Sequence, residues 1–273
     1  MNTRLVGGLV LLGLLVASCL AGLLLVDLDD ARPLSAAIAH PPSAEYWLGT
    51  DTAGRDLAAV LVLGTLLTAK VGLLAGLIGI TVGTVLAFVA AYYGGWTDRL
   101  ISAVVDVLLT VPGLLVLIVL ASAYPGQMTT TLMALVIAGL AWREPARQIR
   151  SQVLVMREAN YVRMARLSGQ GGLSIIFHEM IPNLLPYLGA GLVSAVSAAI
   201  LASVGLEALG LGPRGEPTLG MTIYWMILDG AFLRGLWWWI LEPVAVLIIL
   251  FVGMYLLVTG LDETANPRLR RRA

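Results

Sequence analysis

The chain has 273 residues, of which 59% are hydrophobic and only 12% are charged, and its 17 basic and 17 acidic side chains cancel to a formal net charge of zero. This composition lies outside the range of soluble globular domains and indicates a protein surrounded by lipid. The balanced charge gives no reason to expect a nucleic-acid partner. One cysteine, Cys19, and two isolated histidines, His40 and His178, predict neither an intrachain disulfide nor a metal site.

The first apolar run, residues 5–26, is long enough to cross a bilayer as a helix. A secretory signal is the alternative interpretation, because Val16-Ala17-Ser18-Cys19 resembles a lipoprotein cleavage box. The run exceeds the roughly 7–15 residues of a signal core, which favours a first transmembrane helix within residues 1–26.

A polar segment with several prolines, residues 27–65, separates this helix from the rest of the chain and ends in a short amphipathic stretch at 57–63. We expect it on the extracytoplasmic side. Five more apolar runs follow, the fourth crossing being the shortest: 66–93, 101–123, 129–142, 186–206 and 237–261. The sequence therefore predicts an all-α membrane protein of about six transmembrane helices, with its membrane core in residues 66–273.

Four glycines of the second crossing lie on neighbouring faces of the expected helix: Gly72, Gly76, Gly79 and Gly83. Small residues let membrane helices approach closely, so this pattern predicts tight packing. Glycine is common in membrane helices, and the pattern does not identify a function.

The distribution of basic residues predicts the orientation. With the N-terminus inside, twelve arginines fall in inner segments and four in outer ones, which leaves Lys70 within a helix. Because short cytoplasmic loops are rich in Lys and Arg, both termini are expected in the cytoplasm.

Catalytic motifs are missing from the sequence. It contains no G-x-x-x-x-G-K-[ST] phosphate loop, no H-E-x-x-H and no G-x-S-x-G. We therefore expect no enzyme activity and no ATP hydrolysis by this chain. Lys70 and Asp106 are the main ionisable residues inside the crossings, which disfavours an ion-coupled carrier.

The inner loop at 143–182 is long, basic and helix-forming, which indicates a docking surface for another protein. Within residues 158–168, Tyr161, Ala165 and Ser168 have helical spacing, and the following glycines, Gly169, Gly171 and Gly172, are expected to end this helix. A second amphipathic helix at 173–181 should lead to Pro182 and Pro186, where the chain returns to the membrane. An ordinary surface hairpin is the alternative.

This loop resembles that of the inner-membrane permeases of dipeptide, oligopeptide and nickel ABC importers. Those permeases carry Glu-Ala-Ala, a Gly four residues later, and an apolar pair and Pro beyond. The matching positions keep the spacing, although two of the first three letters differ: Arg163, Met164, Ala165, Gly169, Met180, Ile181 and Pro182.

Five other segments resemble motifs of the same family, in the same order along the chain. They are 48–56 in the outer segment, 92–100 in the second inner loop, 105–112 in the third helix, 209–213 after the fifth helix and 266–270 at the C-terminus.

The resemblance implies a type I ABC importer permease, the second, C-type permease of a heterodimeric pair, in a bacterial or archaeal cytoplasmic membrane. It also implies three kinds of partner: a second homologous permease chain, two cytosolic ATPase subunits that bind ATP and Mg²⁺, and an extracytoplasmic substrate-binding protein. No cofactor is expected on this chain.

Two sets of candidate site residues follow. The resemblance implies a coupling helix that contacts an ATPase through Tyr161, Arg163, Ala165, Arg166, Ser168 and Gly169. Candidates for the translocation pathway are Lys70, Asp106 and Glu207. We expect Lys70 about four residues inside the second helix and Glu207 just beyond the fifth, where they either pair at the outer mouth or contact a charged substrate. A snorkelling lysine and a loop glutamate are the alternative.

Peptides are the expected substrate, and nickel chelates, opines or oligosaccharides are the alternatives within the family. A secondary carrier and a membrane protein without a transport role are the alternatives outside it.

Overall fold

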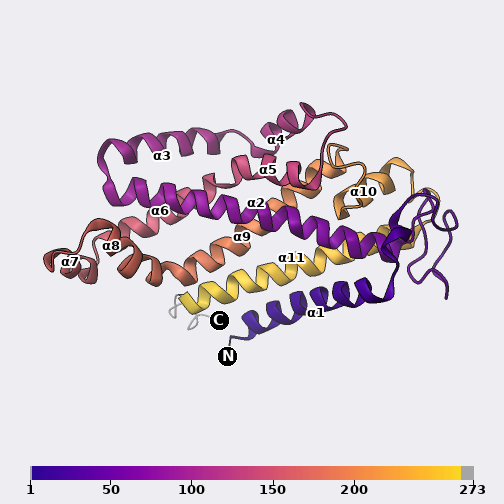
Figure 1. The fold of residues 1–273 in the computed structure, drawn as a ribbon, viewed down its shortest axis with the longest axis horizontal. Coiled ribbons are helices and arrows are strands. Elements are labelled where there is room, and N and C mark those ends of the chain that lie inside the picture. Colours follow the sequence, from indigo (N-terminus) through magenta and orange to yellow (C-terminus); the bar gives the residue numbers. More distant parts are fainter. Residues whose placement is uncertain (1, 266–273) are drawn as a thin grey trace.

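The computed structural model describes residues 2–265, and within this range the chain is helical with one isolated β-bridge. The long helices lie side by side along the longest axis of the molecule (Figure 1). One end of that axis carries α7 and α8, and the opposite end carries residues 27–56.

The first and last predicted crossings are confirmed as helices: α1 spans Thr3–Leu25 and α11 spans Trp237–Ala265. They pack against each other in opposite directions. Glycine permits this approach, since a Cβ on Gly8 would lie 2.7 Å from the backbone nitrogen of Leu257. The Arg4 Nη1 to Glu263 Oε1 distance of 2.7 Å joins the start of α1 to the end of α11.

The second crossing is longer than predicted. A single helix, α2, spans Leu57–Tyr93, so the amphipathic stretch at 57–63 is its first two turns and not a separate element. Asp56 starts the helix by accepting a hydrogen bond from the backbone nitrogen of Ala58 at 2.9 Å.

The glycines of α2 have the predicted packing role. Cβ atoms on Gly72 and Gly76 would clash with Ile200 and Val196 of α9. On the neighbouring face, a Cβ on Gly83 would lie 2.9 Å from the backbone nitrogen of Ala146. The helix α2 is therefore the central element, with α9 on one side and the α5–α6 stretch on the other.

The third crossing is not one straight helix. It consists of α3, Gly95–Thr110, and α4, Gly113–Ser122, which meet at an angle of 80°. Pro112 lies at the break. Proline has no backbone N–H to donate to the carbonyl four residues earlier, and it disfavours the helical conformation of the residue before it.

The fourth crossing, α5, spans only Thr130–Ala141, and α6, Arg143–Arg157, follows after one residue. The segment that begins the predicted inner loop is thus a helix packed along α2 and α3. Only the part after α6 projects from the helical body (Figure 1).

The projecting part consists of α7, Asn160–Leu167, and α8, Gly172–Ile175. A π-helical turn, Ile176–Met180, joins α8 directly to α9, Ile181–Ala208. The prolines therefore do not separate the loop from the membrane helix as predicted: Pro182 lies in the first turn of α9, where its missing N–H costs little.

The structure adds α10, Leu219–Leu228, which sequence reasoning missed. Four of the described helices are apolar and long enough to cross a membrane: α1, α2, the stretch from α8 through α9, and α11. The bent pair α3–α4 makes a fifth, and α5 and α10 are shorter apolar helices. The all-α membrane architecture is confirmed. The predicted number of six crossings is reached only if α5, which has 12 residues, is counted as a crossing.

The outer segment is held by buried polar contacts. It contains one 3₁₀ turn, Leu28–Ala31, and a buried ion pair in which Arg55 Nε lies 2.6 Å from Asp51 Oδ2. Trp238 at the start of α11 donates from Nε1 to the Thr50 carbonyl at 3.2 Å. The 48–56 motif thus fixes the outer segment to α11.

Candidate functional site

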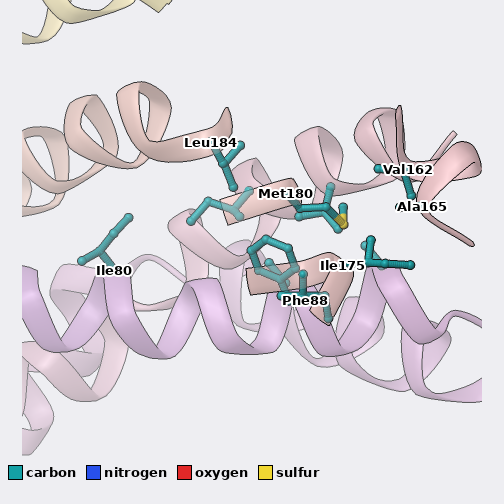
Figure 2. Close-up of a cluster of buried hydrophobic side chains, with 12 residues drawn as sticks. Ile80, Phe88, Val162, Ala165, Ile175, Met180 and Leu184 are labelled. Atoms are coloured by element: carbon teal, nitrogen blue, oxygen red, sulfur yellow. The ribbon is translucent and has the colours of Figure 1, made fainter. Parts of the chain in front are cut away.

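The helix α7 is attached to the body by its buried side. Val162 and Ala165 are buried in an apolar cluster to which α2 contributes Phe88 and the turn before α9 contributes Met180 (Figure 2). Ile175 of α8 completes the contact on the same side. This cluster makes α7 part of a packed unit, so a force on α7 reaches α2, α6 and α9.

The opposite side of α7 and its neighbourhood is an exposed apolar surface, which we call the α7 tip. Met164 is 62% exposed and Leu167 is 83% exposed. The remaining members are Tyr161, Leu173 and Phe177, which are also exposed. These large apolar side chains lie at the end of the molecule, on α7, on α8 and on the π-helical turn before α9. An exposed apolar surface of this kind is typical of a protein interface.

The predicted coupling residues divide between these two sides. Tyr161 belongs to the α7 tip, whereas Ala165 is buried and anchors the helix. Arg166 stacks over the ring of Tyr92 at 5.5 Å, which ties α7 to the end of α2. Sequence reasoning missed the exposed Leu167, although its position one turn after Arg163 is visible in the helical spacing.

Two of these residues pair within the chain. Arg163 Nη2 lies 3.2 Å from Glu158 Oε2, and the Arg163 hydrogen bond lowers the pKa of Glu158 below its ordinary value. Ser168 donates to the Met164 carbonyl at 3.0 Å inside the last turn.

The helix-ending glycine is confirmed at one position of the three. Gly169 has a φ of +80°, and the next residue, Gln170, donates its N–H back to the Ala165 carbonyl at 3.1 Å. The predictions for Gly171 and Gly172 are wrong, because Gly171 has a φ of −69° and precedes α8 while Gly172 is its first residue.

The arginines of α6 lie against α3 and α2. Arg150 makes a bidentate contact with Asp98 at 2.6 and 2.7 Å, and Arg157 Nη1 donates to the Ala91 carbonyl at 2.8 Å. Both arginines are therefore bound within the chain, whereas the side chains of the α7 tip are exposed.

A hollow of about 470 Å³ lies between α4, the α5–α6 junction and α9. Its polar lining is Arg143, Glu144, Gln148 and Ser194. Small residues of α9 form much of the wall: Gly191, Ala195, Ala198, Ala202 and Gly205. Their spacing of three and four residues was a signal that sequence reasoning could have used.

The predicted pathway residues do not line this hollow. Asp106 lies 3.5 Å from Arg147 on an exposed face of α3. Lys70 Nζ contacts Thr130 Oγ1 at 3.4 Å, and it lies 13 residues after the start of α2, about 20 Å along the helix and not the short distance expected.

Glu207 lies inside α9 and not beyond it. Its carboxylate is fully buried and accepts hydrogen bonds from Ser203 Oγ and Thr218 Oγ1, each at 2.7 Å. Lys70 is not its partner in this structure. Gly220 gives the carboxylate room at the start of α10, so Glu207 fastens α10 to α9.

Comparison with known proteins agrees with this geometry. Residues 79–271 match the family described as "Binding-protein-dependent transport system inner membrane component". The chain is 30% identical over 235 residues to the oligopeptide transport system permease protein OppC of Mycobacterium tuberculosis, covering 86% of this chain and 80% of the relative. It is 33% identical over 233 residues to the dipeptide transport system permease protein DppC of Bacillus subtilis, covering 85% and 71%.

A putative peptide transport system permease protein of Brucella suis is 31% identical over 268 residues, which cover 96% of this chain and 87% of that relative. The matches include the helices around the hollow and the projecting α7. The family match and the apolar helices together show a multi-pass protein of the bacterial cytoplasmic membrane. The chain belongs to the inner membrane components of binding-protein-dependent transport systems and is a permease subunit of an ABC importer.

Proposed function

We propose that this chain forms half of the translocation pathway of a peptide importer and is driven through the α7 tip by ATPase subunits. A second, homologous permease completes the pathway, and an extracytoplasmic binding protein delivers the substrate. ATP and Mg²⁺ bind to the two ATPases. The names of the relatives, which refer to oligopeptide and dipeptide transport, support peptides as the substrate class.

The α7 tip is the observation that carries this proposal. Its exposed side chains extend from a helix whose other side is buried, so the surface is both open to a partner and rigidly attached. When two ATPases close, their motion reaches the permease only through a segment that is rigidly packed against it. Packed helices move as rigid bodies, so α7 can transmit this motion.

We infer that this surface faces the cytoplasm. The contact between Arg4 and Glu263 brings the start of α1 and the end of α11 together, toward the end of the molecule that carries α7 (Figure 1). The excess of arginines in the predicted inner segments supports a cytoplasmic location for that end.

Orientation is tested with single cysteines at two exposed residues, Glu45 in the outer segment and Thr97 in the predicted second inner loop, in a Cys19→Ser background. An impermeant thiol reagent added to intact cells should label Glu45→Cys and spare Thr97→Cys until the cells are opened. The reverse pattern would overturn the orientation.

ATPase docking is tested by Leu167→Asp, which places a charge in the α7 tip. The matched control is Leu233→Asp, because Leu233 is 90% exposed and lies in the connection between α10 and α11, outside the α7 tip. After purification of the whole transporter in detergent, Leu167→Asp should lose its ATPase subunits and Leu233→Asp should keep them. Equal retention by both variants would contradict docking at α7.

Substrate class is tested by mass spectrometry of the small molecules released from the co-purified binding protein. Peptides that are then imported into proteoliposomes by the whole transporter would support the proposal. A nickel chelate, an opine or an oligosaccharide as the only released and imported ligand would replace peptides.

A further inference from the structure

Arg143 lies where two helices end. Its Nη1 donates to the Leu108 carbonyl in the last turn of α3 at 2.6 Å, and its Nε donates to the Leu140 carbonyl in the last turn of α5 at 2.8 Å. The C-terminal end of a helix carries partial negative charge, so one guanidinium stabilises both ends.

Pro112 makes the first of these contacts necessary. In a continuous helix the Leu108 carbonyl would accept from the N–H of residue 112, but proline has none. The carbonyl needs another donor, and Arg143 from α6 provides it. The 80° bend between α3 and α4 is thus completed by a side chain that comes from elsewhere in the fold.

The backbone around the bend also fits the guanidinium. A Cβ on Gly113 would lie 2.6 Å from Arg143 Nη2, so a side chain at this position would displace the group. Gly113, Leu114 and Leu117 of α4 form one wall of the hollow, and Arg143 lines it at the bend.

Arg143 is the first of three arginines on one face of α6 that contact α3. Arg147 lies 3.5 Å from Asp106, and Arg150 contacts Asp98. The spacing of four and three residues places all three on the same face. This face ties α3 to α6 along its length, and α6 runs about 22 Å from the hollow toward α7.

We propose that Arg143 is a positioning residue of transport, which carries displacement of α6 to α4 and so moves one wall of the hollow. The inference rests on the proposed function, since it assumes that ATPases move the α7 tip. The arginine face of α6 then acts inside the permease. Because Arg143 binds the Leu108 carbonyl, α6, α3 and the bend between α3 and α4 move together.

Two variants remove this contact by different routes. Arg143→Gln shortens the donor and removes its charge, while Gly113→Ala keeps the arginine but places a Cβ where its Nη2 lies and so displaces the guanidinium. Gly139→Ala is the matched control, because a Cβ on Gly139 of α5 would meet nothing within 4 Å.

The experiment measures substrate imported per ATP hydrolysed by the whole transporter in proteoliposomes. Arg143→Gln and Gly113→Ala should each lower this ratio by about fivefold to tenfold, with ATPase subunits still bound and ATP hydrolysis still stimulated by loaded binding protein. The double variant should be no worse than the more severe single variant, because both act on one contact. Gly139→Ala should match the wild type.

A merely structural role for Arg143 would lower import and hydrolysis together and leave their ratio unchanged, which would overturn the proposal. An unchanged ratio in Gly113→Ala, or an additive loss in the double variant, would also overturn it. If Arg143→Gln does not accumulate in the membrane, the ratio of import to ATP hydrolysis in Gly113→Ala, compared with that in Gly139→Ala, tests the proposal. Failure of the proposed function is distinct, because the wild-type transporter would then import no peptide.

Discussion

The end of the molecule that carries residues 27–56, which we call the outer end, and the end that carries α7, which we call the inner end, differ in the burial of their ion pairs. At the outer end the Asp51–Arg55 pair is buried and Trp238 donates to the Thr50 carbonyl, although the Arg32–Asp29 pair is exposed. At the end that carries α7, Leu167 and its apolar neighbours are exposed and the nearby ion pairs are exposed as well. The 48–56 motif is therefore held by contacts within the chain, whereas the apolar side chains of the α7 tip are open to a partner.

The largest expected effect of a substitution is at the outer end. Arg55→Met leaves the buried Asp51 carboxylate without its cationic partner, which should cost about 3–5 kcal/mol of unfolding free energy. Thermal unfolding of the detergent-purified protein, followed by Trp fluorescence, measures the loss. Arg32→Met is the control, because its pair with Asp29 is exposed and should contribute nothing measurable. Equal melting temperatures for both variants would contradict a stabilising role for the buried pair.

The next effect concerns Glu207, which fastens α10 to α9. Glu207→Ala removes the acceptor of the Ser203 and Thr218 hydroxyls and should cost about 2–3 kcal/mol in the same assay. Glu207→Gln keeps the shape and one acceptor oxygen and should lose less. Glu45→Ala at an exposed position is the control. If Glu207 acted only in the translocation pathway and did not hold α10 against α9, Glu207→Ala would have a normal melting temperature and altered import.

A smaller effect is expected at Gly169. A Cβ there would meet nothing within 4 Å, so Gly169→Val is disfavoured only by the backbone φ of +80°, at a cost of about 1–3 kcal/mol. The end of α7 should rearrange, and stimulated ATP hydrolysis should fall while membrane insertion persists.

Gly171→Val is the matched control for this prediction. A Cβ on Gly171 also meets open space, and its φ of −69° suits any residue. Equal ATP hydrolysis in the two variants would show that the left-handed turn after α7 does not matter for coupling.

These contrasts explain how much the sequence could predict. Long apolar runs and the turn at Gly169 depend on local properties, and both were predictable from composition and helix-ending rules. The third crossing was predicted as one helix although Pro112 was visible, because the bend depends on Arg143, which is 31 residues away and supplies the missing donor.

Charged residues were the hardest to interpret. The arginines of α6 were assigned to a docking surface, since the sequence does not show that Asp98 and Ala91 lie beside them. Glu207 is predicted just beyond the fifth helix at the outer mouth of the pathway, because one of its partners, Thr218, is brought close only by the turn between α9 and α10. Burial of a charge depends on tertiary contacts, and local sequence does not contain them.

The smallest effect is expected at Arg163, whose partner Glu158 is exposed at the inner end. Arg163→Gln should lower the melting temperature at neutral pH only slightly, because a solvated pair of this kind contributes little. The Arg163 hydrogen bond lowers the pKa of Glu158 below 4.5, so the contribution of the pair is present above this value and is lost as the pH falls through the lowered pKa. Melting temperatures of wild type and variant should therefore keep a constant, small difference from pH 7 to about pH 5 and converge only below pH 4.5. A large destabilisation at pH 7 would mean that Arg163 holds α7 in place, and the inner end would then resemble the outer end more than the structure indicates.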